Sequence, residues 1–164
     1  MTIRLSPTSD LERSTKSGVS EASQKLQYEI APEVDRIFRE PISWRWKDDL
    51  EEDVIEILEE CEEEGWDGYG AKPIKPENKY RIKMILDLLQ YNLLPPEIIP
   101  EPDGYLSFEW RRDDVAFSVT VEPCKLVYAA ILGAGRTQHG EEPFYGDDLP
   151  EAIKDILTKY FLNV

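Results

Sequence analysis

The chain has 164 residues and carries 34 acidic against 19 basic side chains, which gives a formal net charge of −15. This acidity disfavours direct binding of nucleic acid, because such a field repels phosphates. One histidine and two cysteines cannot by themselves complete a structural zinc site, and no apolar run is long enough to span a membrane, so we expect no metal, no cofactor and a cytoplasmic protein.

The N-terminal part is predicted to be a flexible tail that precedes one folded domain. Residues 1–25 are rich in Ser, Thr and charge, with few large apolar side chains, so they cannot bury enough surface to offset the entropy of ordering. A single α+β domain is expected over residues 26–164. It opens with a predicted helix from near Pro32 to just before Pro41, followed by a short extended segment in which Ile42, Trp44 and Trp46 alternate.

Two amphipathic helices are predicted next. In residues 49–64 the apolar side chains recur at the spacing of one helix face, and Gly65 suits the position just past a helix end. After a turn at Asp67-Gly68, residues 77–91 repeat the helical spacing, with five side chains expected to face inward: Tyr80, Met84, Ile85, Leu88 and Leu89. We expect the two helices to form an antiparallel hairpin.

The apolar period then changes from 3.6 to 2, which indicates strands. Residues 105–110 and 115–121 alternate, and residues 125–132 are apolar on both faces, as in a central strand. The short links predict an antiparallel β-meander of three or more strands. A loop is expected over residues 133–146, and a closing helix over residues 149–161, so the fold class is α+β.

The charge is concentrated in one block. Residues 48–67 contain twelve acidic side chains and no basic one, whereas residues 72–83 contain five basic side chains and one acidic. Glutamates at the C-terminal end of a helix oppose its dipole, and acidic pairs four residues apart repel each other. We interpret the block as a surface for a cationic partner, with Glu56, Glu59, Glu60, Glu63 and Glu64 as its contact residues. The alternative is a solvated face that the basic residues of the next helix neutralise.

A glycine-rich segment follows this block. Gly65, Gly68 and Gly70 allow a tight turn, and they flank Trp66, Asp67 and Tyr69, which together have the composition of a recognition loop. The alternative is that both aromatic side chains fold back onto the domain while the glycines shape the connection between two helices.

The Trp-Asp-Gly-x-Gly-Ala segment at residues 66–71 resembles one found after an acidic helix in a family of uncharacterised bacterial proteins. A later Pro-Asp-Gly-x4-Glu-Trp segment of that family is matched by Pro102, Asp103, Gly104, Glu109 and Trp110. The resemblance spans about residues 66–161 and implies that the loop and Glu109 matter, but it brings no activity with it.

An enzyme is the alternative of a different class. Glu109 and His139 could share acid and base roles if they meet in one cleft, with Asp67, Tyr128 or Thr137 nearby. Against catalysis, the sequence shows no nucleophile motif and no phosphate-binding loop.

The favoured function is therefore non-enzymatic. We expect a binding protein that engages a basic protein surface as an inhibitor, antitoxin-like or immunity-like protein, and we expect its partner to be a nucleic-acid-binding protein or a toxin. Electrostatic steering is assigned to the acidic helix, and anchoring to Trp66 and Tyr69. A third possibility is a structural subunit of a larger complex, which would expose a large apolar patch.

Overall fold

The computed structural model describes residues 45–163. The predicted tail at residues 1–25, the predicted helix that begins near Pro32 and the start of the 26–164 domain lie outside the described residues. The described elements are, in chain order, the helices and strands α2 (Arg45–Glu60), α3 (Glu77–Leu88), β1 (Glu97–Pro100), β2 (Leu106–Arg112), β3 (Val115–Val121), β4 (Lys125–Leu132), β5 (Thr137–Pro143) and α4 (Glu151–Tyr160).

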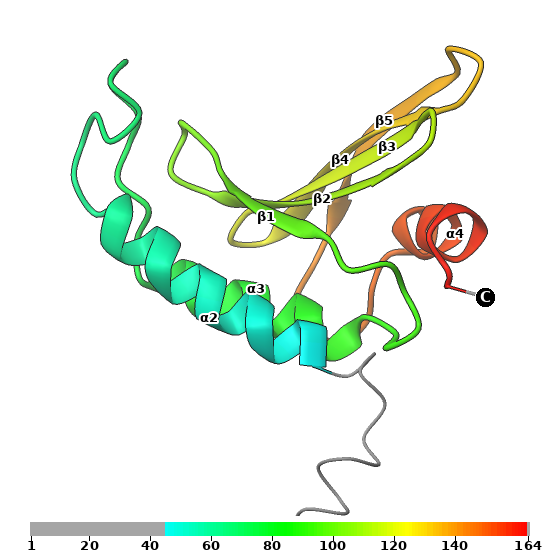
Figure 1. Cartoon of the computed structure of the whole chain (residues 1–164), viewed down its shortest axis with the longest axis horizontal. Helices are drawn as coiled ribbons and strands as arrows, with labels where there is room; N and C mark the ends of the chain where they lie inside the picture. Colours follow the sequence, from blue (N-terminus) through cyan, green and yellow to red (C-terminus); the bar gives the residue numbers. More distant parts are fainter. Residues whose placement is uncertain (1–44, 164) are drawn as a thin grey trace, which may run out of the picture. The chain divides into compact units, whose positions relative to one another are not determined.

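The five strands form one antiparallel sheet in the order β1-β2-β3-β4-β5 (Figure 1). Each strand pairs with its neighbour in sequence, so the sheet is a meander. Side chains alternate between the two faces, and the residues that sequence periodicity places on one side of β2 are buried: Leu106, Phe108 and Trp110. The mixed α+β class and the antiparallel meander are thus confirmed.

The two edge strands were not predicted. β1 is only four residues long and ends at Pro100. Three further prolines, Pro95, Pro96 and Pro102, lie within two residues of its ends. β5 occupies the middle of the segment that we expected to be a loop over residues 133–146, so that prediction is wrong, and His139 belongs to a strand. The strand escaped detection because its residues, TQHGEEP, are polar on both faces.

The first described helix begins and ends earlier than predicted. Trp46 does not continue an extended segment, because α2 starts at Arg45 and the indole of Trp46 is buried, with its Nε1 donating to the carbonyl of Tyr91 (3.1 Å). The helix ends at Glu60 rather than Glu64. Gly65 is therefore not the residue just past the helix end, as predicted, but part of the following loop.

Helix α3 buries a face that matches the predicted one only in part. Of the five side chains predicted to face inward, Ile85 and Leu89 are buried and Leu88 packs against the core, whereas Tyr80 and Met84 are exposed. The buried face also includes Asn78, Ile82 and Leu86, and the helix ends at Leu88 rather than at residue 91. Contacts join the start of α2 to the end of α3, since the Nζ of Lys47 donates to the carbonyl of Leu89 (2.6 Å), so the two helices run side by side in opposite directions. Helix α2 also contacts β1 at the edge of the sheet.

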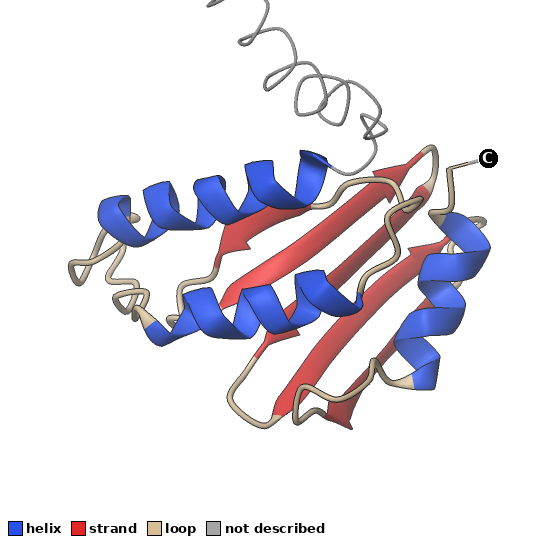
Figure 2. Ribbon diagram, turned by 90° about the horizontal axis from the view of Figure 1, so that it is seen from below, coloured by secondary structure: helices blue, strands red, loops and turns tan. Residues whose placement is uncertain are grey.

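All three described helices lie on one face of the sheet (Figure 2). The core fills the space between the layers, and at its centre Trp110 stacks on Phe108 and Phe117, with ring centroids 5.7 and 5.6 Å apart. The guanidinium group of Arg112 on β2 donates hydrogen bonds to the carbonyls of Tyr160 and Leu162 (3.1 and 2.9 Å), which connects the end of α4 to the sheet. The opposite face of the sheet, called the open face below, carries no described helix.

Candidate functional site

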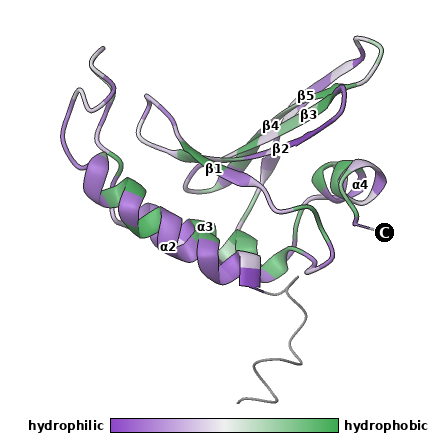
Figure 3. Ribbon diagram, viewed as in Figure 1, coloured by the Kyte–Doolittle hydropathy of each residue, from purple (hydrophilic) through white to green (hydrophobic). Residues whose placement is uncertain are grey.

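The acidic residues of α2 point away from the core. The helix alternates between a buried side with Trp46, Leu50 and Val54 and an outer side that is strongly hydrophilic (Figure 3). Its last turn contains no basic residue. The five glutamates predicted to contact a partner, called the acidic surface from here on, are all exposed: Glu56, Glu59, Glu60, Glu63 and Glu64.

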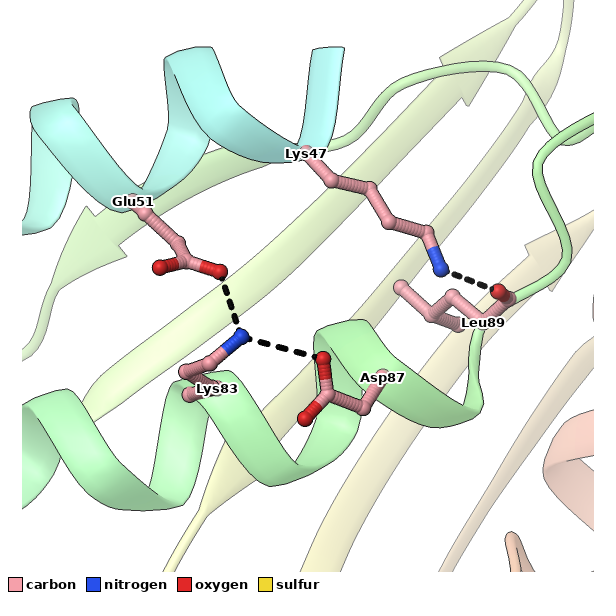
Figure 4. A network of polar contacts seen from close by, with 5 residues as sticks. All are labelled: Lys47, Glu51, Lys83, Asp87 and Leu89. Carbon is pink, nitrogen blue, oxygen red and sulfur yellow. Dashed lines mark hydrogen bonds and ion pairs between the residues drawn. The ribbon is translucent and has the colours of Figure 1, made fainter. Parts of the chain in front are cut away.

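The basic residues of the next segment do not neutralise the acidic surface. Within the described residues, the one ion pair between the two charge blocks joins Lys83 to Glu51 (2.8 Å), and Lys83 also pairs with Asp87 of its own helix (3.1 Å; Figure 4). Hydrogen bonds to Glu51 and Asp87 raise the pKa of Lys83. Glu51 lies in the first half of α2, so this pair leaves the acidic surface untouched, and none of its five glutamates forms an ion pair with another described residue.

The loop of residues 65–70 is held in one shape by Asp67. Its Oδ1 accepts hydrogen bonds from the amides of Tyr69 (2.8 Å) and Ala71 (3.0 Å), and the amides of Ala71 and then Tyr69 lower the pKa of this carboxyl group. The amide of Gly65 donates to the carbonyl of Ala71 and closes the loop (2.7 Å). Gly68 and Gly70 have φ of +80° and +95°, a conformation that the Cβ atom of any other residue disfavours.

The two aromatic side chains of this loop take different positions. Trp66 is half-buried, packs against the core and donates from Nε1 to the carbonyl of Lys72 (2.9 Å). Tyr69 is 96% exposed. The loop thus presents Tyr69 to solvent, whereas much of Trp66 is used within the domain and Asp67 is used within the loop.

The turn at residues 102–104 packs against the residues that follow the 65–70 loop. The amide of Lys72 donates to the carbonyl of Pro102 (2.8 Å), and the side-chain amide of Asn78 donates to the carbonyl of Gly104 (3.2 Å). A Cβ on Gly104 would lie 3.2 Å from the carbonyl oxygen of Pro73, so the close approach needs glycine. This turn therefore supports the base of the 65–70 loop.

A hollow of about 350 Å³ lies beside this junction, and sequence reasoning did not identify it. Lys72, Lys75 and Arg81 line it together with Tyr105. The sequence signal for this hollow is the excess of basic residues over 72–83. We interpreted these residues only as charges that could neutralise the acidic block.

Glu109 and His139 both line a hollow of about 400 Å³ on the open face. The strand registers Glu109↔Ser118, Ser118↔Ala129 and Ala129↔His139 place the two residues at the ends of one row that crosses four strands. Small side chains of β3 and β4 line its middle, among them Ala116, Ser118 and Ala129. Longer side chains of β2 and β5 lie at its two ends, with Glu109 on one side and His139 on the other. Of the predicted neighbours, Thr137 joins the hollow, whereas Asp67 lies in the 65–70 loop and Tyr128 faces the core.

Glu109 and His139 do not form a hydrogen-bonded pair. Three strand spacings separate their backbones, which is about 14 Å in a flat sheet. Glu109 instead accepts a hydrogen bond from the guanidinium of Arg111 (2.8 Å), and this contact raises the pKa of Arg111. Direct proton exchange between the carboxyl group and the imidazole therefore needs a bridging molecule.

No group of histidine, cysteine or carboxylate side chains within residues 45–163 is arranged to hold a metal ion. In the same part of the chain, no helix has the length and apolar character needed to cross a bilayer.

Comparison of the chain with protein-family models, with curated proteins and with solved structures finds no match.

Proposed function

We propose that this protein binds a partner protein with a basic surface, and that the acidic surface of α2 and the exposed Tyr69 make the contact. The role is that of an inhibitor, antitoxin-like or immunity-like protein acting in the cytoplasm. Its partner would be a toxin or a nucleic-acid-binding protein whose basic groove the carboxylates occupy. The observation that carries this proposal is the acidic surface itself, which is exposed and without ion pairs among the described residues.

The position of the carboxylates on the helix supports a cationic partner. Glu59 and Glu60 lie in the last turn of α2, where the helix dipole is negative, and each unfavourable interaction of this kind costs about 0.3–1 kcal/mol. Lysine or arginine side chains of a partner would remove this cost and the repulsion between neighbouring glutamates. Long-range attraction would also accelerate the encounter, in a manner that salt screens.

Tyr69 supplies the short-range part of the proposed interface. Exposed tyrosines bring a large apolar area and a hydroxyl group at low cost in side-chain entropy, and they are frequent among residues that dominate binding energy. The Asp67 hydrogen bonds and the closed 65–70 loop fix the backbone of Tyr69 before binding, which reduces the entropy lost on association.

The proposal is tested by affinity capture of partners from the native host with the full chain at low and high salt, followed by binding kinetics with the purified partner. Charge reversal of Glu59, Glu60, Glu63 and Glu64 to lysine should slow association at least tenfold at low salt. The matched control reverses four exposed acids nearer the start of α2, Asp48, Asp49, Glu52 and Asp53, so that the net charge changes equally. Equal effects of the two sets would show that net charge alone matters and would contradict a defined acidic surface.

The anchor is tested separately. Tyr69→Ala should accelerate dissociation by a factor corresponding to about 2 kcal/mol, as expected for a residue that dominates an interface. Tyr80→Ala is the matched control, because Tyr80 is an exposed tyrosine on α3 outside the proposed contact. If Tyr69→Ala and the wild type dissociate at the same rate, Tyr69 is not an anchor.

An enzyme that uses Glu109 and His139 is the second candidate, because both residues line one hollow with Ser118 between them. In this case a substrate must bridge them, since they do not contact each other directly. Screening small molecules by NMR and following the resonances of His139 and Ser118 tests it. A ligand that shifts both, and whose binding is lost in Glu109→Gln, would favour an enzyme over a binding protein.

A further inference from the structure

Strand β5 has an unused edge. In an antiparallel pair, residues whose backbone groups face the neighbouring strand alternate with residues whose groups face away. The amide of Leu132 donates to the carbonyl of Arg136 (2.8 Å), and the amide of Phe144 donates to the carbonyl of Cys124 (2.9 Å). The backbone N–H and C=O groups of the even-numbered residues of β5 therefore point toward β4. The outward amides accordingly belong to Thr137, His139 and Glu141.

This edge is accessible in the described part of the chain. The side chains of Thr137, Gln138, His139 and Glu141 are exposed. The carboxylate of Glu141 accepts a hydrogen bond from the Nζ of Lys125 (2.9 Å) through one oxygen, and the side chain stays 61% exposed. Helix α4 does not cover the strand, because a groove of about 470 Å³ separates Gln138 from the α4 residues Asp155 and Lys159. Among the described residues, no hydrogen bond reaches the outward amides of β5.

The sequence of β5 is complementary to itself in the antiparallel direction. When two copies are aligned about Gly140, His139 of one copy lies opposite Glu141 of the other, on the open face. On the helix side, Gln138 lies opposite Glu142, and the amide of one side chain can donate to the carboxylate of the other. Both contacts occur twice because the arrangement has a twofold axis.

The backbone groups suit this register as well. The outward-facing pairs His139–Glu141 and Thr137–Pro143 would exchange ladder hydrogen bonds, and Pro143, which lacks an amide, still offers its carbonyl. Shifting the alignment by two residues in either direction would place His139 opposite His139, or Glu141 opposite Glu141. Two carboxylates directly opposite each other destabilise a sheet, and either shift loses the contact between imidazole and carboxylate, so the alignment about Gly140 is favoured.

We propose that two copies of this chain associate through β5, antiparallel about Gly140, so that the two sheets become continuous. The large negative charge does not prevent this pairing, because the acidic helix α2 contacts β1, at the opposite edge of the sheet. The inference is independent of the proposed function, since it uses neither the acidic surface nor Tyr69.

The test is sedimentation equilibrium of the full chain over a range of concentrations, with circular dichroism of each variant as the folding control. The wild type should reach the mass of a dimer. His139→Pro removes one outward amide from each copy without touching the β4 ladder, and edge positions of this kind tolerate proline. It should raise the dissociation constant roughly tenfold or more, because two ladder hydrogen bonds are lost.

Charge variants test the register. His139→Glu places two carboxylates opposite each other, and Glu141→Lys replaces the carboxylate that faces the imidazole with an ammonium group, so each should weaken association roughly threefold to tenfold. The double variant H139E/E141K restores opposite charges and should recover the affinity of the wild type. Single variants that weaken association without recovery in the double variant would overturn the register.

Disulfide trapping gives a second measure of the same register in a background with Cys124→Ser, since Cys124 is an exposed thiol. Mixing His139→Cys chains with Glu141→Cys chains should give mainly the mixed disulfide, because these positions lie directly opposite each other. A wild type that stays monomeric at all concentrations, or chains that form mainly like-with-like disulfides, would refute the proposal.

Discussion

Replacing Gly140 with alanine should destabilise the protein through one side chain. Gly140 lies opposite Tyr128 in the β4–β5 pair, and a Cβ at this position would lie 2.8, 2.9 and 3.0 Å from the Oη, Cζ and Cε1 atoms of Tyr128. The ring is buried and packs edge-on against Phe117, at 6.3 Å between centroids, so it has little freedom to move aside. We expect Gly140→Ala to lower the free energy of unfolding by about 1–3 kcal/mol, as overpacking does elsewhere.

The sign of this effect should reverse when the ring is removed. In a Tyr128→Ala background, alanine at position 140 meets no ring and restricts the unfolded chain more than glycine does, so it should stabilise by about 0.5–1 kcal/mol. The coupling between the two sites is then about 2 kcal/mol or more, which a double-mutant cycle resolves. Tyr128→Phe, which removes the nearest atom and leaves the ring, should reduce the penalty only in part.

Urea unfolding of the four chains, followed by tryptophan fluorescence and circular dichroism at low protein concentration, measures the cycle. The matched control is Thr137→Ala, on the open face of the same strand, which should stay within about 0.5 kcal/mol of the wild type. An equal penalty for Gly140→Ala with and without the Tyr128 ring would refute the reasoning, because the glycine would then be needed for a reason other than close approach.

Three further outcomes are expected. Arg112→Ala should lower the free energy of unfolding by about 1–3 kcal/mol in urea titrations, because the carbonyls of Tyr160 and Leu162 lose their donor; a cost no larger than that of Arg111→Ala would contradict this. Burial lowers the pKa of Lys47, so at alkaline pH the unfolded state binds more protons than the folded state. The stability of the wild type relative to Lys47→Met should therefore rise with pH until the pH reaches the ordinary lysine pKa of about 10.4; a flat difference would exclude the shift. The amides of Ala71 and then Tyr69 lower the pKa of Asp67, so the stability that this carboxylate contributes is present above about pH 4 and disappears as the pH falls further. In NMR titrations the amides of Tyr69 and Ala71 should therefore report an acidic midpoint below that of an unperturbed aspartate, and this titration should vanish in Asp67→Asn.

The elements with a strong apolar period were predictable from the sequence, and those without one were not. Strands β2, β3 and β4 each bury one face against the core, so apolar side chains recur at every second position of their sequences. β5 buries little, because its core-side positions are Gln138, Gly140 and Glu142 at a sheet edge, and β1 is too short to show any period. The start of α2 was missed although Trp46, Leu50 and Val54 follow helical spacing, because the alternation of Ile42, Trp44 and Trp46 suggested a strand.

At the candidate site, the position of the charge was predictable from the sequence, but the ion pairs and the exposure of individual side chains were not. The acidic block is visible in the sequence, but whether the basic residues of α3 neutralise it depends on the rotation of that helix, which Asn78 and Ile82 set by facing the core. The different positions of Trp66 and Tyr69 depend on the hydrogen bonds of Asp67 and Lys72 within a loop of unusual backbone angles, and no periodic pattern encodes them.

The prolines that bracket β1 limit how large an assembly of this chain can become. Adding strands at both edges of a sheet would let copies join without end, as in a filament. At β1, Pro95, Pro96, Pro100 and Pro102 remove amide donors from and around a strand of four residues, so that edge is a poor acceptor of another strand. With one edge usable, strand addition terminates after a single step and the product stays finite.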